Sequence, residues 1–309
     1  MTICFTALTT NLSNTGGNRT IIRSVDELRK QGNDVSVVAR KDRYTWDEHK
    51  TVLKSIPKSD VNIAVSVLDI KNTINSKSKR KFIWMRGVEN WFWPEDKILR
   101  RLDKFINQGG RILVNSSWLK TYLIRKNLES TLCYSGLDIN TIHSPRTEGR
   151  VRIGCLYHKT HKTKGWHLFR RLADILGYDN YEYAGFGVGR PKECDWLTRY
   201  HNDPSPEKKD ALFKSCNIWF SPTFWEGFHS VPAEANLMGC LVVCSNSESN
   251  GLSDYCNSDT SMVYSTLTEA ADMCRNPEYN RVERMQYRLM NKIGTRKENM
   301  RKFVKEISR

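Results

Sequence analysis

The sequence predicts an α/β protein made of two Rossmann-like domains, each a doubly wound parallel β-sheet. Short apolar runs alternate with amphipathic helical patterns along all 309 residues. Runs of this kind are typical of parallel strands, which are buried on both faces. The alternation is interrupted once, by the polar stretch 138–150 with Pro145 and Gly149, and then resumes. Strand–helix alternation with one interruption indicates two domains joined by a hinge.

The first predicted domain, an N-terminal Rossmann-like domain, covers residues 1–145. Its strands are expected at 2–8, 34–39, 61–67, 81–85, 111–115 and 130–134. The clearest helix covers residues 19–33, where apolar residues recur at helical spacing until Gly32 supplies a stop. A second amphipathic helix is expected after Pro94.

The second predicted domain covers residues 146–309. Its strands are expected at 151–158, 181–186, 217–222 and 240–245. Its helices are expected near 165–177, 207–215, 232–239 and 266–275. The basic tail 277–308 has a helical pattern with a break at Gly294, and we expect its final helix to pack back toward the N-terminal domain.

Composition and cysteine usage indicate a folded protein of the cytoplasm. Hydrophobic residues make up 39% and charged residues 27% of the chain, which is ordinary for a globular protein. No apolar run reaches the length of a membrane span, and the start lacks the pattern of a signal peptide. Nine cysteines show no metal-binding spacing, and Cys155, Cys240 and Cys244 lie in strand-like contexts typical of buried thiols.

The charge is strongly basic and unevenly distributed. The formal net charge is +15. Residues 1–150 contain 26 Lys and Arg against 15 Asp and Glu, whereas the remainder contains 23 against 19. A basic first half suggests a polyanionic partner such as nucleic acid, an anionic membrane or a charged glycan. The alternative is a generally basic surface that is simply solvated.

Two glutamates eight positions apart, Glu226 and Glu234, are the most informative pair in the chain. Glu226 lies in the loop after the strand predicted at 217–222, and Glu234 lies just inside a helix that opens near Pro232. Ligands of parallel sheets bind at these carboxyl ends of strands. The backbone N–H groups at such a helix start suit a phosphate. Here they belong to Gly227, Phe228, His229 and Ser230.

Two carboxylates beside a phosphate site indicate a ligand that also carries sugar hydroxyls. A carboxylate accepts two hydroxyl hydrogens at once, so each glutamate suits a vicinal diol. A nucleotide sugar has phosphates in the middle and hydroxyls at both ends. The alternative interpretation is a pair of carboxylates that only complements the positive end of a helix.

The segment 221–243 resembles the E-x7-E signature of retaining GT-B glycosyltransferases, the bacterial and phage enzymes of the glycosyl transferases group 1 type. The matching residues are Ser221-Pro222, Glu226-Gly227-Phe228, Glu234-Ala235, Gly239 and Val242-Val243. The resemblance implies the GT-B fold, in which two Rossmann-like domains face a central cleft. It also implies that Glu226 is a catalytic residue facing the transferred sugar, and that Glu234 holds the ribose diol.

The resemblance extends to residues that would bind the diphosphate of the donor. Lys164, followed by Gly165, corresponds to a lysine that pairs with the diphosphate and is the second catalytic candidate. His158 or Lys159 stands where the family has an arginine. The sequence contains no DxD, so we expect no metal and assign charge neutralisation to Lys164 and backbone N–H groups. A solvated basic loop is the alternative interpretation of this stretch.

Two glycine segments complete the predicted donor site. Gly16 and Gly17 resemble the family's first glycine loop, which lets the backbone approach the donor phosphate. The run 185–189, with Gly187, resembles a small loop lining the donor pocket. A dinucleotide-binding loop is the alternative for that run, but the third glycine of that fingerprint is missing.

The resemblance places the acceptor on the first domain. The candidates to line the region near the reacting sugar are Arg86, Glu89 and Asn90. They belong to a stretch, 77–105, in which basic residues are interleaved with aromatic ones. The further acceptor-side candidates in or near this stretch are Trp91, Arg100, Arg101 and Lys104, with Trp84 and Trp93 as aids in holding an opened duplex.

Three interpretations of stretch 77–105 remain open at this point. It is an amphipathic core helix with a solvated basic side, a face that follows DNA phosphates, or an anchor on a membrane surface. Because the chain is compact and basic, it resembles phage enzymes that glycosylate hydroxymethylated DNA, and we favour that acceptor. The alternatives are a cell-envelope polysaccharide or lipid-linked glycan, and a non-catalytic nucleic-acid-binding Rossmann protein.

The predicted activity is therefore that of a retaining, metal-independent hexosyltransferase. Its donor is expected to be a UDP-linked sugar such as UDP-glucose, with no further cofactor and no structural metal. We expect it in the cytoplasm of a bacterial host or phage-infected cell, with a peripheral position at the inner membrane surface as the alternative.

Overall fold

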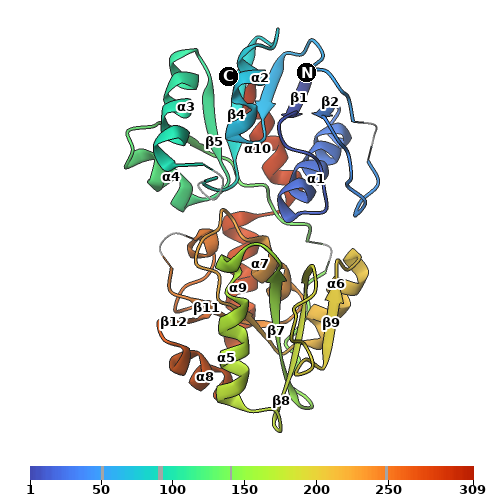
Figure 1. Cartoon of the computed structure of the whole chain (residues 1–309), viewed down its shortest axis with the longest axis vertical. Coiled ribbons are helices and arrows are strands. Elements are labelled where there is room, and N and C mark those ends of the chain that lie inside the picture. Colours follow the sequence, from blue (N-terminus) through green and yellow to red (C-terminus); the bar gives the residue numbers. More distant parts are fainter. Residues whose placement is uncertain (50–51, 90–92, 140, 248–249) are drawn as a thin grey trace. The chain divides into compact units, whose positions relative to one another are not determined.

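A computed structural model describes residues 1–49, 52–89, 93–139, 141–247 and 250–309. The chain divides into two compact units, coloured along the sequence in Figure 1. Unit 1 comprises Met1–Gly136 together with Gly294–Arg309, and unit 2 comprises Leu137–Ile293.

Unit 1 contains a six-stranded parallel sheet in the order β2-β1-β3-β4-β5-β6. Its strands are β1 (Thr2–Ala7), β2 (Asp34–Ala39), β3 (Val61–Ala64), β4 (Arg80–Met85), β5 (Arg111–Val114) and β6 (Thr131–Leu132). All six were predicted from the apolar runs. The order reverses between β1 and β3, so the loops after these two strands leave the sheet in opposite directions.

The helices of unit 1 are α1 (Gly16–Lys30), α2 (Ile70–Ile74), α3 (Glu95–Asn107), α4 (Ser117–Ile124) and α10 (Arg296–Ser308), with a 3₁₀ turn η1 (Val67–Asp69). Helix α1 begins three residues before the predicted start because Thr15 caps it. The Thr15 hydroxyl accepts a hydrogen bond from the Asn18 backbone N–H at 3.2 Å.

The last helix, α10, completes the core of unit 1. Met300, Phe303 and Ile307 are fully buried there. The ring of Phe303 lies 6.3 Å from that of Phe5 on β1 and 4.9 Å from that of Trp84 on β4. Large aromatic side chains of this kind contribute much of the burial that stabilises a core.

The division of the chain differs from the predicted boundary at 145/146. Unit 2 begins at Leu137 rather than at residue 146, whereas Gly294–Arg309, with the final helix, lies in unit 1, toward which that helix was expected to pack. The stretch predicted as a hinge is tied to unit 2: the His143 N–H donates to the Leu237 carbonyl at 2.9 Å, and Arg146 donates to the Ser215 carbonyl at 2.7 Å. These contacts explain why the stretch belongs to the second unit.

Unit 2 contains a second parallel sheet, in the order β12-β11-β10-β7-β8-β9. Its strands are β7 (Val151–His158), β8 (Tyr181–Val188), β9 (Arg199–Asn202), β10 (Ile218–Ser221), β11 (Leu241–Ser245) and β12 (Met262–Tyr264). Its helices are α5 (Trp166–Leu176), α6 (Pro206–Ser215), α7 (Ser230–Leu237), α8 (Leu267–Arg275) and α9 (Asn280–Arg288). Shorter turns are η2 (Lys162–Lys164), η3 (Gly251–Asp254) and the π-helical η4 (Leu289–Ile293).

The strand order of unit 2 reverses between β7 and β10. In sheets of this type ligands bind beside such a reversal, at the carboxyl ends of the strands. The loop after β7 carries Lys164, and the loop after β10 carries Glu226. The topology therefore places both predicted catalytic residues at the expected edge of the second sheet.

Within the described ranges, every helix falls short of the length or the apolar character that crossing a membrane would require. The nine cysteines are free thiols, and eight of them are buried. Cys155, Cys240 and Cys244 are among the buried ones, as predicted.

Candidate functional site

The loop of residues 222–229, between β10 and α7, is held in place by its neighbours on both sides. The Phe224 N–H donates to the Thr163 carbonyl at 3.1 Å. The Thr223 carbonyl accepts from the Ser245 hydroxyl at 3.0 Å and from the Asn250 side-chain amide at 2.8 Å. The loop that carries Glu226 is therefore anchored to the loops after β7 and β11.

Gly251 lets its own backbone lie close to the loop that carries Glu226. Its N–H donates to the Glu226 carbonyl at 3.3 Å. A Cβ atom at this position would lie 2.8 Å from the Phe228 Cα, and closer still to the Gly227 carbonyl oxygen. Contacts that short do not occur in folded proteins, so the position requires glycine.

Lys164 and Glu226, the two predicted catalytic residues, form an ion pair. Their side chains are 13% and 28% exposed. Burial lowers the pKa of the Lys164 ammonium, to about 7. The neighbouring Glu226 carboxylate acts in the opposite direction, because a negative charge favours the protonated form of a lysine. The next residue, Gly165, has φ +70°, and its added Cβ would lie 2.8 Å from the Pro222 side chain. Glycine there lets the Lys164 turn pack against the end of β10.

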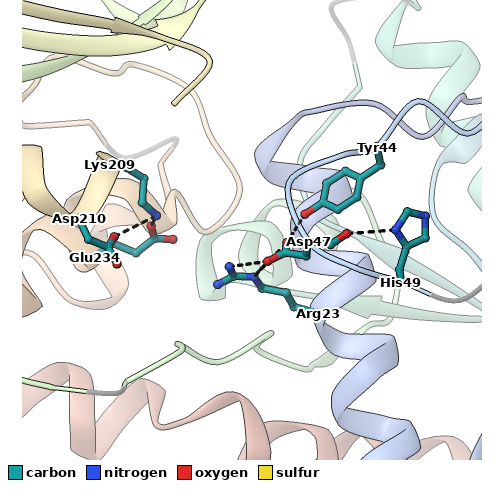
Figure 2. A network of polar contacts seen from close by, with 7 residues as sticks. All are labelled: Arg23, Tyr44, Asp47, His49, Lys209, Asp210 and Glu234. Atoms are coloured by element: carbon teal, nitrogen blue, oxygen red, sulfur yellow. Dashed lines mark hydrogen bonds and ion pairs between the residues drawn. The ribbon is translucent and has the colours of Figure 1, made fainter. Parts of the chain in front are cut away.

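Glu234 forms an ion pair with Lys209, a residue that we did not predict (Figure 2). The Lys209 side chain is 8% exposed and that of Glu234 is 25% exposed. Lys209 lies on α6, on the same face as the buried Leu212 and Phe213. A lysine at an apolar position of a helix is the sequence signal that identifies such a residue, because a buried ammonium needs a partner.

His229 precedes α7 in a strained backbone conformation. Its φ of 51° is in the left-handed region, which is uncommon for a residue other than glycine. Its carbonyl accepts a hydrogen bond from the Tyr255 hydroxyl. The imidazole is buried, and both ring nitrogens lack a hydrogen-bond partner among the described residues. Burial, together with the Lys164 charge, lowers the pKa of His229 well below its usual value.

The other predicted N–H donors surround this residue. Gly227 and Phe228 are buried in the loop, and Ser230 is the first residue of α7. Whether their N–H groups bind a phosphate stays a prediction.

His158 and Lys159, predicted as alternatives for a second positive charge, differ in their surroundings. His158 ends β7, and its Nδ1 accepts hydrogen bonds from the N–H groups of Thr160 and His161, both at 3.3 Å. Burial, followed by the charges of His161 and Lys164, lowers the pKa of His158 to about 4. The His158 ring is therefore neutral at pH 7. Lys159 is exposed and remains the candidate for the second charge.

Gly187 lies inside strand β8, so the predicted loop over 185–189 is corrected at this position. Gly187 pairs with Tyr157 of β7, and an added Cβ would lie 2.6 Å from the Tyr157 carbonyl carbon. The close approach of the neighbouring strand explains the glycine. A role in lining a donor pocket stays a prediction.

In unit 1, Gly16 and Gly17 begin helix α1, and Arg86 lies beside them. The Arg86 guanidinium donates to the carbonyl of Gly17 and, at 3.0 Å, to the carbonyl of Val65 after β3. Burial lowers the pKa of Arg86 to about 10, while Glu89 opposes that shift. These groups lie together where the strand order of the first sheet reverses, between β1 and β3.

Glu89 lies near the same edge of unit 1. Its carboxylate accepts a hydrogen bond from the Ser66 hydroxyl at 2.6 Å, and burial raises its pKa. The predicted residues Asn90 and Trp91 lie outside the described residues.

Helix α3 carries the predicted basic face. Ile98, Leu102 and Phe105 are buried, as expected for an amphipathic core helix. On the remaining surface Arg100 pairs with Asp96, and the Arg101 guanidinium lies 3.9 Å from the centre of the Trp93 ring. Lys104 is exposed.

The prediction that Trp84 helps to hold an opened DNA duplex is wrong, because this side chain cannot contact DNA. Its side chain is fully buried in the core of unit 1, and its indole N–H donates to the Cys133 carbonyl at 3.1 Å. An interior hydrogen bond of this kind satisfies the polar atom of a buried indole.

Within the described part of the chain, no three His, Cys, Asp or Glu side chains are grouped as a metal site requires. Independence from metal stays a prediction.

Neither a protein-family model nor a curated protein matches this sequence. Solved structures do match its fold. Sucrose-phosphate synthase from Thermosynechococcus elongatus matches with a TM-score of 0.78 and 11% identity, over 100% of this chain and 98% of its own. HepE of Anabaena, in complex with UDP and glucose, matches with a TM-score of 0.74 and 13% identity, over 99% of each chain.

A third match is an alpha-glucosyltransferase in complex with UDP and a 13-mer DNA containing a HMU base. Its TM-score is 0.69 at 13% identity, over 100% of this chain and 99% of its own. Together with the two six-stranded parallel sheets, these matches confirm the predicted GT-B fold.

Proposed function

We propose that the protein is a nucleotide-sugar glycosyltransferase that transfers a hexose from a UDP-linked donor to a hydroxyl acceptor. The observation that carries the proposal is the arrangement around the strand reversal of unit 2. Lys164 and Glu226 are paired at that edge, and Glu234 follows on α7. A protein that only bound nucleic acid would have no use for two carboxylates beside a phosphate site.

Each residue has a defined part in the proposed donor complex. Lys164 and the N–H groups of residues 227–230 would neutralise the diphosphate, with no metal or other cofactor. Glu226 would face the transferred sugar, and Glu234 would accept the ribose hydroxyls. Electrostatic stabilisation of the leaving diphosphate would supply most of the rate acceleration.

We propose that the reaction retains the configuration of the sugar. The bond between the anomeric carbon and the phosphate oxygen breaks, and a bond to the acceptor oxygen forms on the same face. The proton of the acceptor hydroxyl passes to the departing phosphate oxygen, so no protein base is required.

The proposal is tested by the effect of nucleotides on thermal stability in the presence of EDTA. UDP or UDP-glucose at about 100 times its dissociation constant should stabilise the folded protein by roughly 2.7 kcal/mol. The measurement is a thermal-shift series with UDP, GDP, ADP and TDP species, each with and without added Mg²⁺. A flat response to every nucleotide would contradict the proposal, and a response that needs Mg²⁺ would contradict metal independence.

For the acceptor, we propose hydroxymethylated DNA, modified in the cytoplasm of an infected bacterial host. Three observations support it: the excess of basic residues in 1–150, the cations of α3, of which Arg100 and Lys104 are exposed, and the bound DNA of the third structural match. Phosphate contacts from Arg100, Arg101 and Lys104 would supply affinity that depends steeply on salt.

Replacing Arg100, Arg101 and Lys104 together by glutamine should weaken DNA binding and leave UDP binding unchanged. The logarithm of the binding constant falls linearly with the logarithm of the salt concentration, and each phosphate contact contributes about 0.9 to the steepness of that line. Loss of three contacts should therefore reduce the steepness by about 2.7. The measurement is DNA binding by fluorescence anisotropy across a salt series. A matched control removes three exposed cations of α10: Lys297, Arg301 and Lys305.

Equal losses in the two triple variants would show that net charge, not α3, is responsible. Transfer of sugar to hydroxymethylated DNA is followed by mass spectrometry of digested nucleosides. If a donor binds well and no sugar reaches DNA, the acceptor is instead an envelope glycan, and the α3 variant should then lose binding to anionic vesicles.

A further inference from the structure

Lys209 is a buried lysine whose position calls for an explanation. It lies on the inner face of α6, one turn before Leu212 and Phe213, where an apolar residue is expected. Only 8% of its side chain is exposed. Burying an ammonium is costly unless it is paired, so the residue at its tip defines what it does.

That residue is Glu234. The Lys209 Nζ donates to Glu234 Oε2, and Figure 2 shows the two side chains directed at each other. Asp210 is a weaker neighbour, since its Oδ1 is 3.8 Å from Nζ and its side chain is 41% exposed. Nζ also lies 5.6 Å from the centre of the Phe213 ring, whose face attracts a cation. Helix packing, the ring and the ion pair together define one position for the ammonium.

This position has two consequences for the Glu234 carboxylate. The ammonium favours the ionised form, in which the carboxylate is only an acceptor. It also restricts rotation of the carboxylate by holding one of its oxygens. A carboxylate oxygen has two lone pairs, so an oxygen that accepts a lysine N–H can still accept a hydroxyl. The pair is therefore compatible with a bound diol.

We propose that Lys209 is a positioning residue that orients Glu234 to accept the ribose hydroxyls of a nucleoside diphosphate. The inference rests on the proposed function, and it adds the residue that makes ribose recognition selective. It follows that the protein distinguishes a ribonucleotide from a deoxyribonucleotide, and that the distinction depends on Lys209.

The experiment compares the dissociation constants of UDP and 2′-deoxy-UDP by calorimetry. For the unmodified protein we expect UDP to bind at least about tenfold more tightly, as the loss of one charge-assisted hydrogen bond requires. In Lys209→Met the ratio should fall to roughly twofold, mainly because UDP binds less tightly. The matched control is Lys208→Met, which removes an exposed neighbouring charge and should leave the ratio unchanged.

Lys209→Arg separates positioning from charge neutralisation. A guanidinium keeps the positive charge but cannot place a nitrogen where Nζ lies. If Lys209 orients Glu234, Lys209→Arg should prefer UDP over 2′-deoxy-UDP clearly less than the unmodified protein does. If the pair only balances charge, the ratio of the two dissociation constants should be unchanged. This variant also decides the question if thermal denaturation shows that Lys209→Met does not fold.

The possible failures are distinguishable. If the unmodified protein binds no nucleotide, the proposed function is wrong and the inference falls with it. If it binds UDP and 2′-deoxy-UDP equally, the ribose role of Glu234 is wrong. If it discriminates and both Lys209 variants discriminate equally well, the inference alone is overturned.

Discussion

Replacing Lys164 by methionine is expected to lower the rate of sugar transfer by about 100- to 1,000-fold. The ammonium lies at the edge of unit 2 beside Glu226, where the proposed diphosphate would gain negative charge as its bond to the sugar breaks. Methionine has a similar length but carries no charge. The measurement is the release of UDP from saturating UDP-glucose with hydroxymethylated DNA as acceptor.

The control is Lys162→Met, in the same turn η2, where the side chain is exposed. It should keep nearly full turnover. Thermal denaturation of both variants checks that they fold. Turnover of folded Lys164→Met within a few-fold of the unmodified protein would show that another group neutralises the leaving diphosphate.

Replacing Gly251 by alanine should impair the same site through the backbone alone. The added methyl group would lie 2.8 Å from the Phe228 Cα, so the loop carrying Glu226 must move. Displacement of a reacting group by about 1 Å can cost 100-fold in rate. Overpacking of this kind also destabilises a fold by about 1–3 kcal/mol. Turnover and urea denaturation measure the two effects.

Ser253→Ala is the comparison, because Ser253 lies in the same turn η3 with an exposed side chain. We expect little change in either measurement. If Gly251→Ala retained full turnover and stability, the close packing of this loop against η3 would not control the position of Glu226.

The sequence predicted much of the fold because buried parallel strands are nearly continuous apolar runs. The strands β2 and β7 have the predicted bounds. Strands β9 and β12 were missed for a physical reason. Arg199–Asn202 is polar and lies at a sheet edge, and Met262–Tyr264 has three residues. Short or polar edge strands lack the periodicity on which such predictions depend.

The candidate site was predictable where a local sequence motif carries its residues. The spacing of Glu226 and Glu234 is local, and so it was found. The Lys209–Glu234 pair depends on how α6 packs beside α7, which no spacing reveals. Similarly, Gly187 looked like a loop residue, although the approach of strand β7 explains it. Contacts between distant segments follow from tertiary packing rather than from local pattern.

The return of the chain to unit 1 at Gly294 has a consequence during protein synthesis. The ribosome synthesises all of Leu137–Ile293 before it reaches α10. At typical elongation rates, synthesis of this segment takes on the order of ten seconds. During that interval Phe5 and Trp84 lack Phe303 as a cover. We therefore expect unit 2, whose residues are contiguous, to reach its native state before unit 1 does. The core of unit 1 is completed only after α10 has been synthesised.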